Sequence, residues 1–125
     1  MIEADIVLYR FNVKILEKHV ELSRLESMTF GTKQNNSIQI PTQYGWEGVR
    51  DFHGVIFTDG YLLYARSDVA SAIVVDNVWS WKKDAVLAVP VSNIGFGWEE
   101  NHHHRYRFEI IQSAKYREAG HRHPR

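Results

Sequence analysis

The residues best suited to chemistry are two arginines near the C-terminal end of the sequence. Arg105 and Arg107 are two positions apart, so on a strand they share one face while Tyr106 and Phe108 occupy the other. Two guanidiniums on one face can hold a phosphate or a carboxylate through bidentate hydrogen bonds. The alternative is a solvated face whose ion pairs contribute about 0.2–1 kcal/mol each. Two further arginines are candidates for the same anion site, Arg50 and Arg66.

A run of histidines precedes these arginines and suggests metal chemistry as an alternative. His102 and His104 are two apart, so on a strand both imidazoles share a face and can begin a zinc site. The spacing of Gly97, His102, His104 and Glu109 resembles the first metal motif of cupins, a β-barrel family, with one residue fewer after the glycine. That resemblance implies a divalent metal such as zinc, held by His102, His104 and Glu109. The opposing interpretation places the histidines in a solvated hairpin loop and expects no cofactor.

Tryptophans are candidates for a flat ligand-binding surface. Trp79 and Trp81 are two apart and, with Trp98, could sandwich a planar ligand, with stacking worth about 1–3 kcal/mol per ring. His104 is a further candidate beside Arg105 and Arg107, because an imidazole adds positive charge as the pH falls. In the competing interpretation the tryptophans form a large part of the core.

Catalytic signatures are missing from the sequence. It contains no glycine-rich phosphate loop and no Gly-x-Ser-x-Gly elbow. Asp51 and His53 are two apart and could form an acid–base pair, although a surface hydrogen bond between them is the simpler interpretation. The sequence therefore favours a non-catalytic protein without excluding an enzyme.

The composition is that of an ordinary soluble domain with a cationic end. The chain has 125 residues, 44% hydrophobic residues, no cysteine and a formal net charge of zero. Residues 101–125 nevertheless hold six bases against two acids, and five of the seven histidines. Zero net charge disfavours general electrostatic binding to nucleic acid. No stretch predicts a signal peptide or a membrane helix, so we expect a cytoplasmic protein.

The elements that must position these residues are predicted to be mostly strands. Valine and isoleucine number 22 against seven leucines, and branching at Cβ favours a pleated sheet. Period-two alternation predicts a strand from Val7 to about Leu16, and hairpin signals recur after residue 52. Residues 16–28 have near-helical apolar spacing and predict a single helix, with a strand through Val20 and Leu22 as the alternative.

The expected fold is therefore α+β and β-dominated. We predict a bent antiparallel sheet of five to seven strands, joined as a meander of hairpins and packed on one N-terminal helix. The stretches 57–65 and 89–94 resemble the hairpin and following strands of pleckstrin-homology and GRAM domains, which implies a small β-barrel as the alternative. Residues 1–112 form one domain, and residues 113–125 are a basic, histidine-containing tail that we expect to be partly disordered.

Three functions compete on these observations. The first is a non-catalytic module that captures an anionic small molecule, phosphate-bearing or nucleotide-like, or an acidic protein surface. The second is a metal-dependent enzyme built on the His-x-His motif. The third is an inhibitory or structural domain that pairs its exposed strand edge with a protein partner, and association into homo-oligomers remains open.

Overall fold

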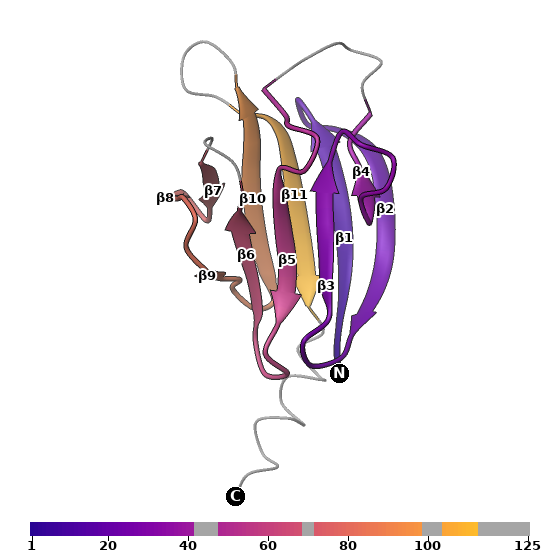
Figure 1. Cartoon of the computed structure of the whole chain (residues 1–125), viewed down its shortest axis with the longest axis vertical. Helices are drawn as coiled ribbons and strands as arrows, with labels where there is room; N and C mark the ends of the chain where they lie inside the picture. Colours follow the sequence, from indigo (N-terminus) through magenta and orange to yellow (C-terminus); the bar gives the residue numbers. More distant parts are fainter. Residues whose placement is uncertain (42–47, 69–71, 99–103, 113–125) are drawn as a thin grey trace, which may run out of the picture.

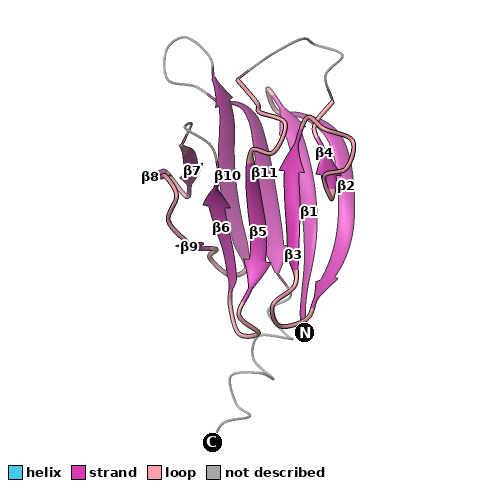
Figure 2. Cartoon of the chain, viewed as in Figure 1, coloured by secondary structure: helices cyan, strands magenta, loops and turns pink. Residues whose placement is uncertain are grey.

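The computed structural model describes residues 1–41, 48–68, 72–98 and 104–112. Within these residues the chain consists of strands, turns and loops, and no helix is present (Figure 2). The strands, in chain order, are β1 (Ile2–Arg10), β2 (Val13–Leu22), β3 (Ser27–Gly31), β4 (Ile38–Gln39), β5 (Gly54–Thr58), β6 (Leu63–Ser67), β7 (Ile73–Val75), β8 (Val78–Ser80), β9 (Ala85–Val86), β10 (Val91–Trp98) and β11 (His104–Gln112).

The strands form two sheets that pack face to face as a β-sandwich (Figure 1). The first sheet has the order β2-β1-β11-β10-β7-β8, and the second has the order β4-β3-β5-β6-β9. The pairing of β3 with β4 is parallel, whereas β1 pairs antiparallel with both β2 and β11. The predicted single bent sheet and the alternative small barrel are both wrong, because the strands divide between two separate layers.

The predicted helix at residues 16–28 is also wrong, and its sequence forms the second half of β2, a turn and the start of β3. Val20 and Leu22 on β2 are buried, in line with the alternative that placed a strand there. Leu25, which the helical spacing assigned to the apolar stripe, is 83% exposed in the turn. The Ser23 N–H donates a 2.9 Å hydrogen bond to Glu26 Oε1, and this bond helps to close the turn.

The alternation from Val7 to Leu16 belongs to two strands instead of one. Phe11 and Asn12 both have positive φ, 48° and 65°, and form a two-residue turn between β1 and β2. Paired positive φ values define the turn type whose twist matches a hairpin. The period-two pattern continues across the turn, which is why the sequence suggested one long strand.

Two of the later hairpins were predicted correctly. β5 and β6 flank Asp59 and Gly60, and β10 pairs with β11 along most of its length. β7 and β8 form a further hairpin, where the sequence predicted a β stretch broken at Asp76 and Asn77, whose φ values are 47° and 69°. The last described residue is Gln112 on β11, so the predicted tail at 113–125 lies outside the described residues. No described helix is long and apolar enough to cross a membrane.

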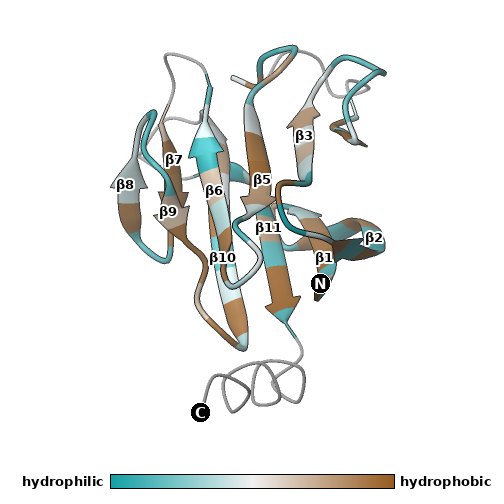
Figure 3. Cartoon of the chain, turned by 60° about the horizontal axis from the view of Figure 1, so that its bottom comes forward, coloured by the Kyte–Doolittle hydropathy of each residue, from teal (hydrophilic) through white to brown (hydrophobic). Residues whose placement is uncertain are grey.

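The core lies between the two sheets and is dominated by aromatic and branched side chains. Hydrophobic residues recur along the strands of both sheets (Figure 3). Phe30 from the second sheet meets Phe96 and Phe108 from the first, with each pair of ring centres 5.1 Å apart. Burying each such ring contributes about 1.5–3 kcal/mol. Polar residues alternate with these core residues along the strands, and they lie on the outer face of the first sheet.

Candidate functional site

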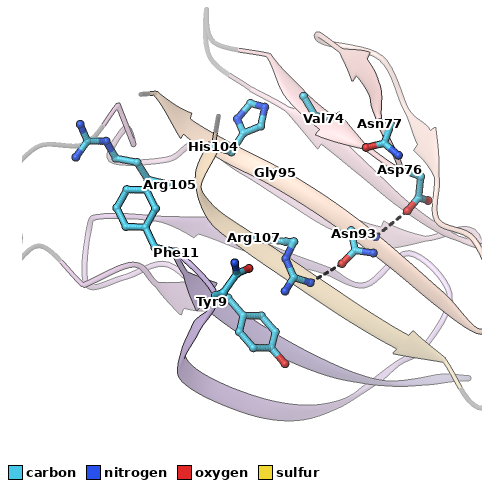
Figure 4. Close-up of a pocket in the computed structure, with 11 residues that line it drawn as sticks. Tyr9, Phe11, Val74, Asp76, Asn77, Asn93, Gly95, His104, Arg105 and Arg107 are labelled. Carbon is cyan, nitrogen blue, oxygen red and sulfur yellow. Dashed lines mark hydrogen bonds between the residues drawn. The ribbon is translucent and has the colours of Figure 1, made fainter. Parts of the chain in front are cut away.

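A hollow of about 870 Å³ lies on the outer face of the first sheet, and we call it the outer-face hollow (Figure 4). Its lining comes from β1, β7, β10 and β11 and from the two turns that carry positive-φ residues, 11–12 and 76–77. The hollow brings together cationic, aromatic and amide side chains from segments distant in sequence. Its basic members are His104, Arg105 and Arg107, and its acidic member is Asp76.

Arg107 projects from β11 into this hollow and is held there by several partners. Its Nη1 donates a 2.7 Å hydrogen bond to Asn93 Oδ1 on β10, and the same nitrogen lies 3.6 Å from Glu109 Oε2. Its guanidinium carbon lies 4.4 Å from the centre of the Tyr9 ring. Among the described residues, Nε and Nη2 of Arg107 make no hydrogen bond. This guanidinium is therefore fixed in position and keeps donors available for an anion.

Arg105 lies at the rim of the hollow, beside Phe11. The Phe11 N–H donates to the Arg105 carbonyl over 3.1 Å, which joins the first turn to β11. The Arg105 guanidinium points away from that of Arg107 in Figure 4. Tyr106 and Phe108 lie in the core, as predicted from the alternation on β11. The two arginines thus share the hollow, but they do not form the converging pair that the sequence suggested.

His104 occupies the other side of the hollow and rests on Gly95. A Cβ on Gly95 would lie 2.9 Å from the His104 ring, so only glycine allows the imidazole to lie this close to β10. The ring of His104 also contacts Trp79 on β8, with ring centres 5.4 Å apart and planes at 60°. Trp79 is 56% exposed, which excludes the interpretation of this tryptophan as a core residue. Trp79 and His104, two of the predicted ligand-binding residues, therefore lie in contact beside the hollow.

The Asp76-Asn77 turn is attached to β10 beside the hollow. Asp76 Oδ2 accepts a 2.6 Å hydrogen bond from Ser92 Oγ, and Oδ1 accepts a 2.8 Å bond from the Asn93 N–H. Asn93 in turn holds Arg107. A continuous chain of hydrogen bonds therefore runs from the β7–β8 turn to the cation in the hollow (Figure 4).

The remaining predicted site residues lie elsewhere. Arg66 is on β6 in the second sheet, where it pairs with Asp68 at 2.9 Å and Asp84 at 3.5 Å. Arg50 precedes β5, and its carbonyl accepts a hydrogen bond from the Thr32 N–H. Trp81 is 53% exposed beyond the end of β8, and Lys82 lies over its ring. Trp98 ends β10 opposite His104. The structure therefore does not place Arg66 with Arg105 and Arg107.

The alternative metal site is not assembled by the described residues. His102 lies outside them, and the Glu109 carboxylate is next to Arg107. No group of three ligating side chains in the described ranges includes His104 or Glu109. The proposed Asp51–His53 pair is also absent, because Asp51 accepts a hydrogen bond from Thr32 and His53 is fully buried.

Sequence analysis missed the residues that complete the hollow around Arg107. Tyr9 and Asn93 meet Arg107 only because β1 and β10 both pair with β11. Asn12 and Asn77 line the hollow from the two turns. The Phe11-Asn12 and Asp76-Asn77 dipeptides could have predicted the two turns, since asparagine tolerates positive φ in tight turns.

Comparison with known proteins identifies the fold. No family model and no curated protein sequence matches the chain. Solved structures do match, and several of them are FHA domains. An engineered FHA with a Myc-pTBD peptide has a TM-score of 0.72 at 11% identity, covering 94% of this chain and 97% of that one. The N-terminal FHA domain of S. cerevisiae Rad53p in complex with a phosphothreonine peptide has a TM-score of 0.70 at 10% identity, covering 91% and 98%.

A bacterial example extends the likeness. The FHA domain of the CT664 protein from Chlamydia trachomatis has a TM-score of 0.64 at 13% identity, covering 91% of this chain and all of that one. The likeness runs over nearly the whole length of each of these domains, whereas sequence identity is low in every case. The chain is therefore an all-β sandwich with the fold of FHA domains.

Proposed function

We propose that this chain is a non-catalytic interaction module that binds a phosphorylated segment of a partner protein, with Arg107 in the outer-face hollow as its main anion contact. The observation that carries this proposal is the fixed guanidinium of Arg107 in a concave site on an FHA-like sandwich. The likeness to the Rad53p domain supports it, because that domain is in complex with a phosphothreonine peptide.

The chemistry of the hollow suits a phosphate better than a neutral ligand. An arginine held in place by Asn93 and Tyr9 loses little side-chain entropy when an anion binds. A charge-assisted hydrogen bond from it contributes about 1.5–3 kcal/mol. Asn12 and Asn77 add amide groups that can bind the peptide backbone next to the phosphate.

His104 and Trp79 extend the binding surface beyond the phosphate. Exposed Trp79 and half-buried His104 form an aromatic surface at one side of the hollow, with their planes at 60°. Such a surface suits an apolar or aromatic side chain adjacent to the phosphorylated residue. Arg105 at the rim contributes positive field that steers an anionic segment toward the hollow.

The loop end of the second sheet is the competing location for the same function. The Thr32 N–H donates to the Arg50 carbonyl, and the Lys33 N–H donates to the Asp51 carbonyl. These bonds hold two exposed cations, Lys33 and Arg50, on adjoining loops. The experiment must therefore distinguish binding in the outer-face hollow from binding at the loop end of the second sheet.

Fluorescence anisotropy with a phosphothreonine peptide library, and with the same peptides unphosphorylated, tests the proposal. We expect binding that requires the phosphate and that Arg107→Ala weakens by at least 10-fold, as the loss of one charge-assisted hydrogen bond implies. Arg24→Ala, which removes an arginine from the β2–β3 turn, is the matched control and is expected to bind normally. A loss confined to Arg50→Ala or Lys33→Ala would move the site to the loop end. Equal binding of phosphorylated and unphosphorylated peptides would reject the function.

A further inference from the structure

A second cluster of side chains that can bind a ligand lies on the outer face of β1 and β2, near the start of the chain. In the antiparallel register Glu3 is directly opposite Glu21, and Asp5 is directly opposite His19. One ligand atom each from Glu3, His19 and Glu21 lies within 4.8 Å of the other two. The four residues form a compact patch, two positions on each strand, that the proposed phosphopeptide site does not use.

The patch gathers three carboxylates around one imidazole, and that imidazole pairs with Asp5. Carboxylates directly opposite each other on neighbouring strands destabilise a sheet. Among the described residues, neither Glu3 nor Glu21 forms an ion pair with a lysine or an arginine. Lys14 pairs with Glu17, and the Lys18 ammonium donates to the Ser37 carbonyl. Among the described residues no lysine or arginine relieves the repulsion between Glu3 and Glu21, and a bound metal ion would relieve it.

The imidazole of His19 is oriented as in many metal sites. Its Nδ1 lies 2.7 Å from Asp5 Oδ1, and with the proton on Nδ1 the Nε2 atom carries the free lone pair. Metal-bound histidines usually donate their second ring nitrogen to a carboxylate in this way, which fixes the tautomer and the ring plane. The carboxylates of Glu3, Asp5 and Glu21 around this ring attract a metal ion.

We propose that Glu3, His19 and Glu21 bind one divalent first-row metal ion, with Asp5 as the residue that holds the imidazole. One nitrogen and two carboxylate oxygens form a donor set suited to Zn²⁺, with water at the remaining position. The ion would link β1 to β2, the edge strand of the first sheet. This site is independent of the outer-face hollow and would persist if the phosphopeptide proposal failed.

The test must exclude the other histidines, which can also bind zinc. We therefore choose the full chain with His102, His103, His104, His121 and His123 replaced by Asn, which leaves His19 and the buried His53. Titration calorimetry with Zn²⁺ is expected to show one site. At a Zn²⁺ concentration about 100 times the dissociation constant, the melting temperature is expected to rise by about 5–10 °C.

Variants and a paramagnetic probe locate the ion. Glu3→Gln with Glu21→Gln, and separately His19→Gln, are expected to weaken zinc binding by more than about 10-fold, and Asp5→Asn by about 10-fold. Glu17→Gln on the same strand is the matched control and is expected to bind normally. Mn²⁺ is expected to broaden the amide signals of residues 3, 19 and 21 first.

Loss of zinc binding through misfolding can be distinguished from loss of the metal ligands by melting the variants without metal. Without metal, the Glu3→Gln, Glu21→Gln protein is expected to melt at or above the temperature of its parent, because the opposed charges are gone. Zinc affinity that is unchanged in this folded variant would overturn the proposal. So would broadening that begins away from β1 and β2, or no heat at about 1 mM Zn²⁺, since a site weaker than that is unoccupied at ordinary zinc levels.

Discussion

Arg107 and Tyr9 are directly opposite each other on β11 and β1, and the guanidinium carbon lies 4.4 Å from the centre of the phenol ring. This contact joins a charged residue near the end of the chain to an aromatic residue near its start. A cation over an aromatic face is attracted by about 0.5–1 kcal/mol at an exposed site. Tyr9 is therefore a positioning residue for the cation that the proposed function uses.

Replacing Tyr9 tests this relationship. Tyr9→Leu is expected to weaken phosphopeptide binding by about 2- to 5-fold, because the guanidinium loses the ring beneath it. Tyr9→Phe keeps the aromatic face and is expected to bind normally. Fluorescence anisotropy measures both variants, alone and combined with Arg107→Ala. Independent, additive effects in that double-mutant cycle would show that the ring does not act through the arginine.

The attachment of Asp76 to β10 makes a second prediction, about stability. Asp76→Ala leaves the buried hydroxyl of Ser92 without its acceptor and is expected to lower the free energy of unfolding by about 1–3 kcal/mol. Asp76→Asn keeps an acceptor and tolerates the positive φ of the turn, so it is expected to cost less. Urea unfolding of both variants provides the measurement. If the two variants lost the same stability, the carboxylate bonds would not be the cause.

The hairpins were predictable because their signals are local. Asp59-Gly60 and Asp76-Asn77 are dipeptides whose backbone preferences already define a tight turn. Residues 16–28 were not predictable in this way. Ile15, His19 and Leu22 have helical spacing by coincidence, and what decides their structure is the pairing of β2 with β1. The division of the strands into two sheets likewise depends on pairings between distant residues.

The same distinction applies to the site: features set by neighbouring residues were predictable, and contacts between distant residues were not. The position of Arg107 on the outer face follows from the alternation along β11, and the sequence alone predicted it. Tyr9 is 98 residues away in the chain and meets Arg107 only through the register of β1 with β11. No local pattern contains that register. A single sequence could therefore identify Arg107 as a candidate anion contact, but it could not identify Tyr9 as a residue that holds it.

The third prediction compares alanine substitutions at two glycines, which we expect to differ in their cost to stability. A Cβ on Gly31 would lie 2.1 Å from the Asp51 carbonyl oxygen, which is backbone and cannot swing away. Gly31→Ala is expected to lower the free energy of unfolding by about 3 kcal/mol or more.

At Gly95 the obstacle is the His104 ring, which can rotate. Gly95→Ala is therefore expected to fold with a loss of about 1 kcal/mol and to displace the imidazole from the hollow. Thermal and urea unfolding compare the two variants, and the His104 ring signals in NMR spectra measure the displacement. Equal losses of stability would contradict the contrast between backbone and side-chain obstacles.

The last prediction concerns acid and rests on His53. This residue is fully buried, with its ring 6.0 Å from Phe30 and 5.6 Å from Phe96 between centres. Its Nδ1 accepts a 3.2 Å hydrogen bond from the Arg50 N–H, and among the described residues Nε2 has no partner. Burial, and secondarily the charge of Arg50, lower the pKa of His53 to about 4.

A lowered histidine pKa means that the folded state favours the neutral imidazole. Above about pH 6.5 the unfolded chain is neutral at this position too, so the full stability is present. As the pH falls from about 6.5 toward 4, the unfolded chain takes up the proton and the folded chain does not. The free energy of unfolding is expected to fall by about 3 kcal/mol over this interval from His53 alone.

His53→Phe isolates this contribution from the carboxylates that titrate over the same range. The phenyl ring suits the pocket of Phe30 and Phe96 but cannot take up a proton, and the Arg50 N–H loses its acceptor. The variant is therefore expected to be less stable than the parent at about pH 7.5, by about 1–3 kcal/mol. Toward pH 4 the difference is expected to shrink by about 3 kcal/mol, because only the parent carries the proton-linked loss. Urea unfolding of both proteins at half-unit steps of pH measures the difference, and two parallel pH profiles would show that His53 is not the group that titrates.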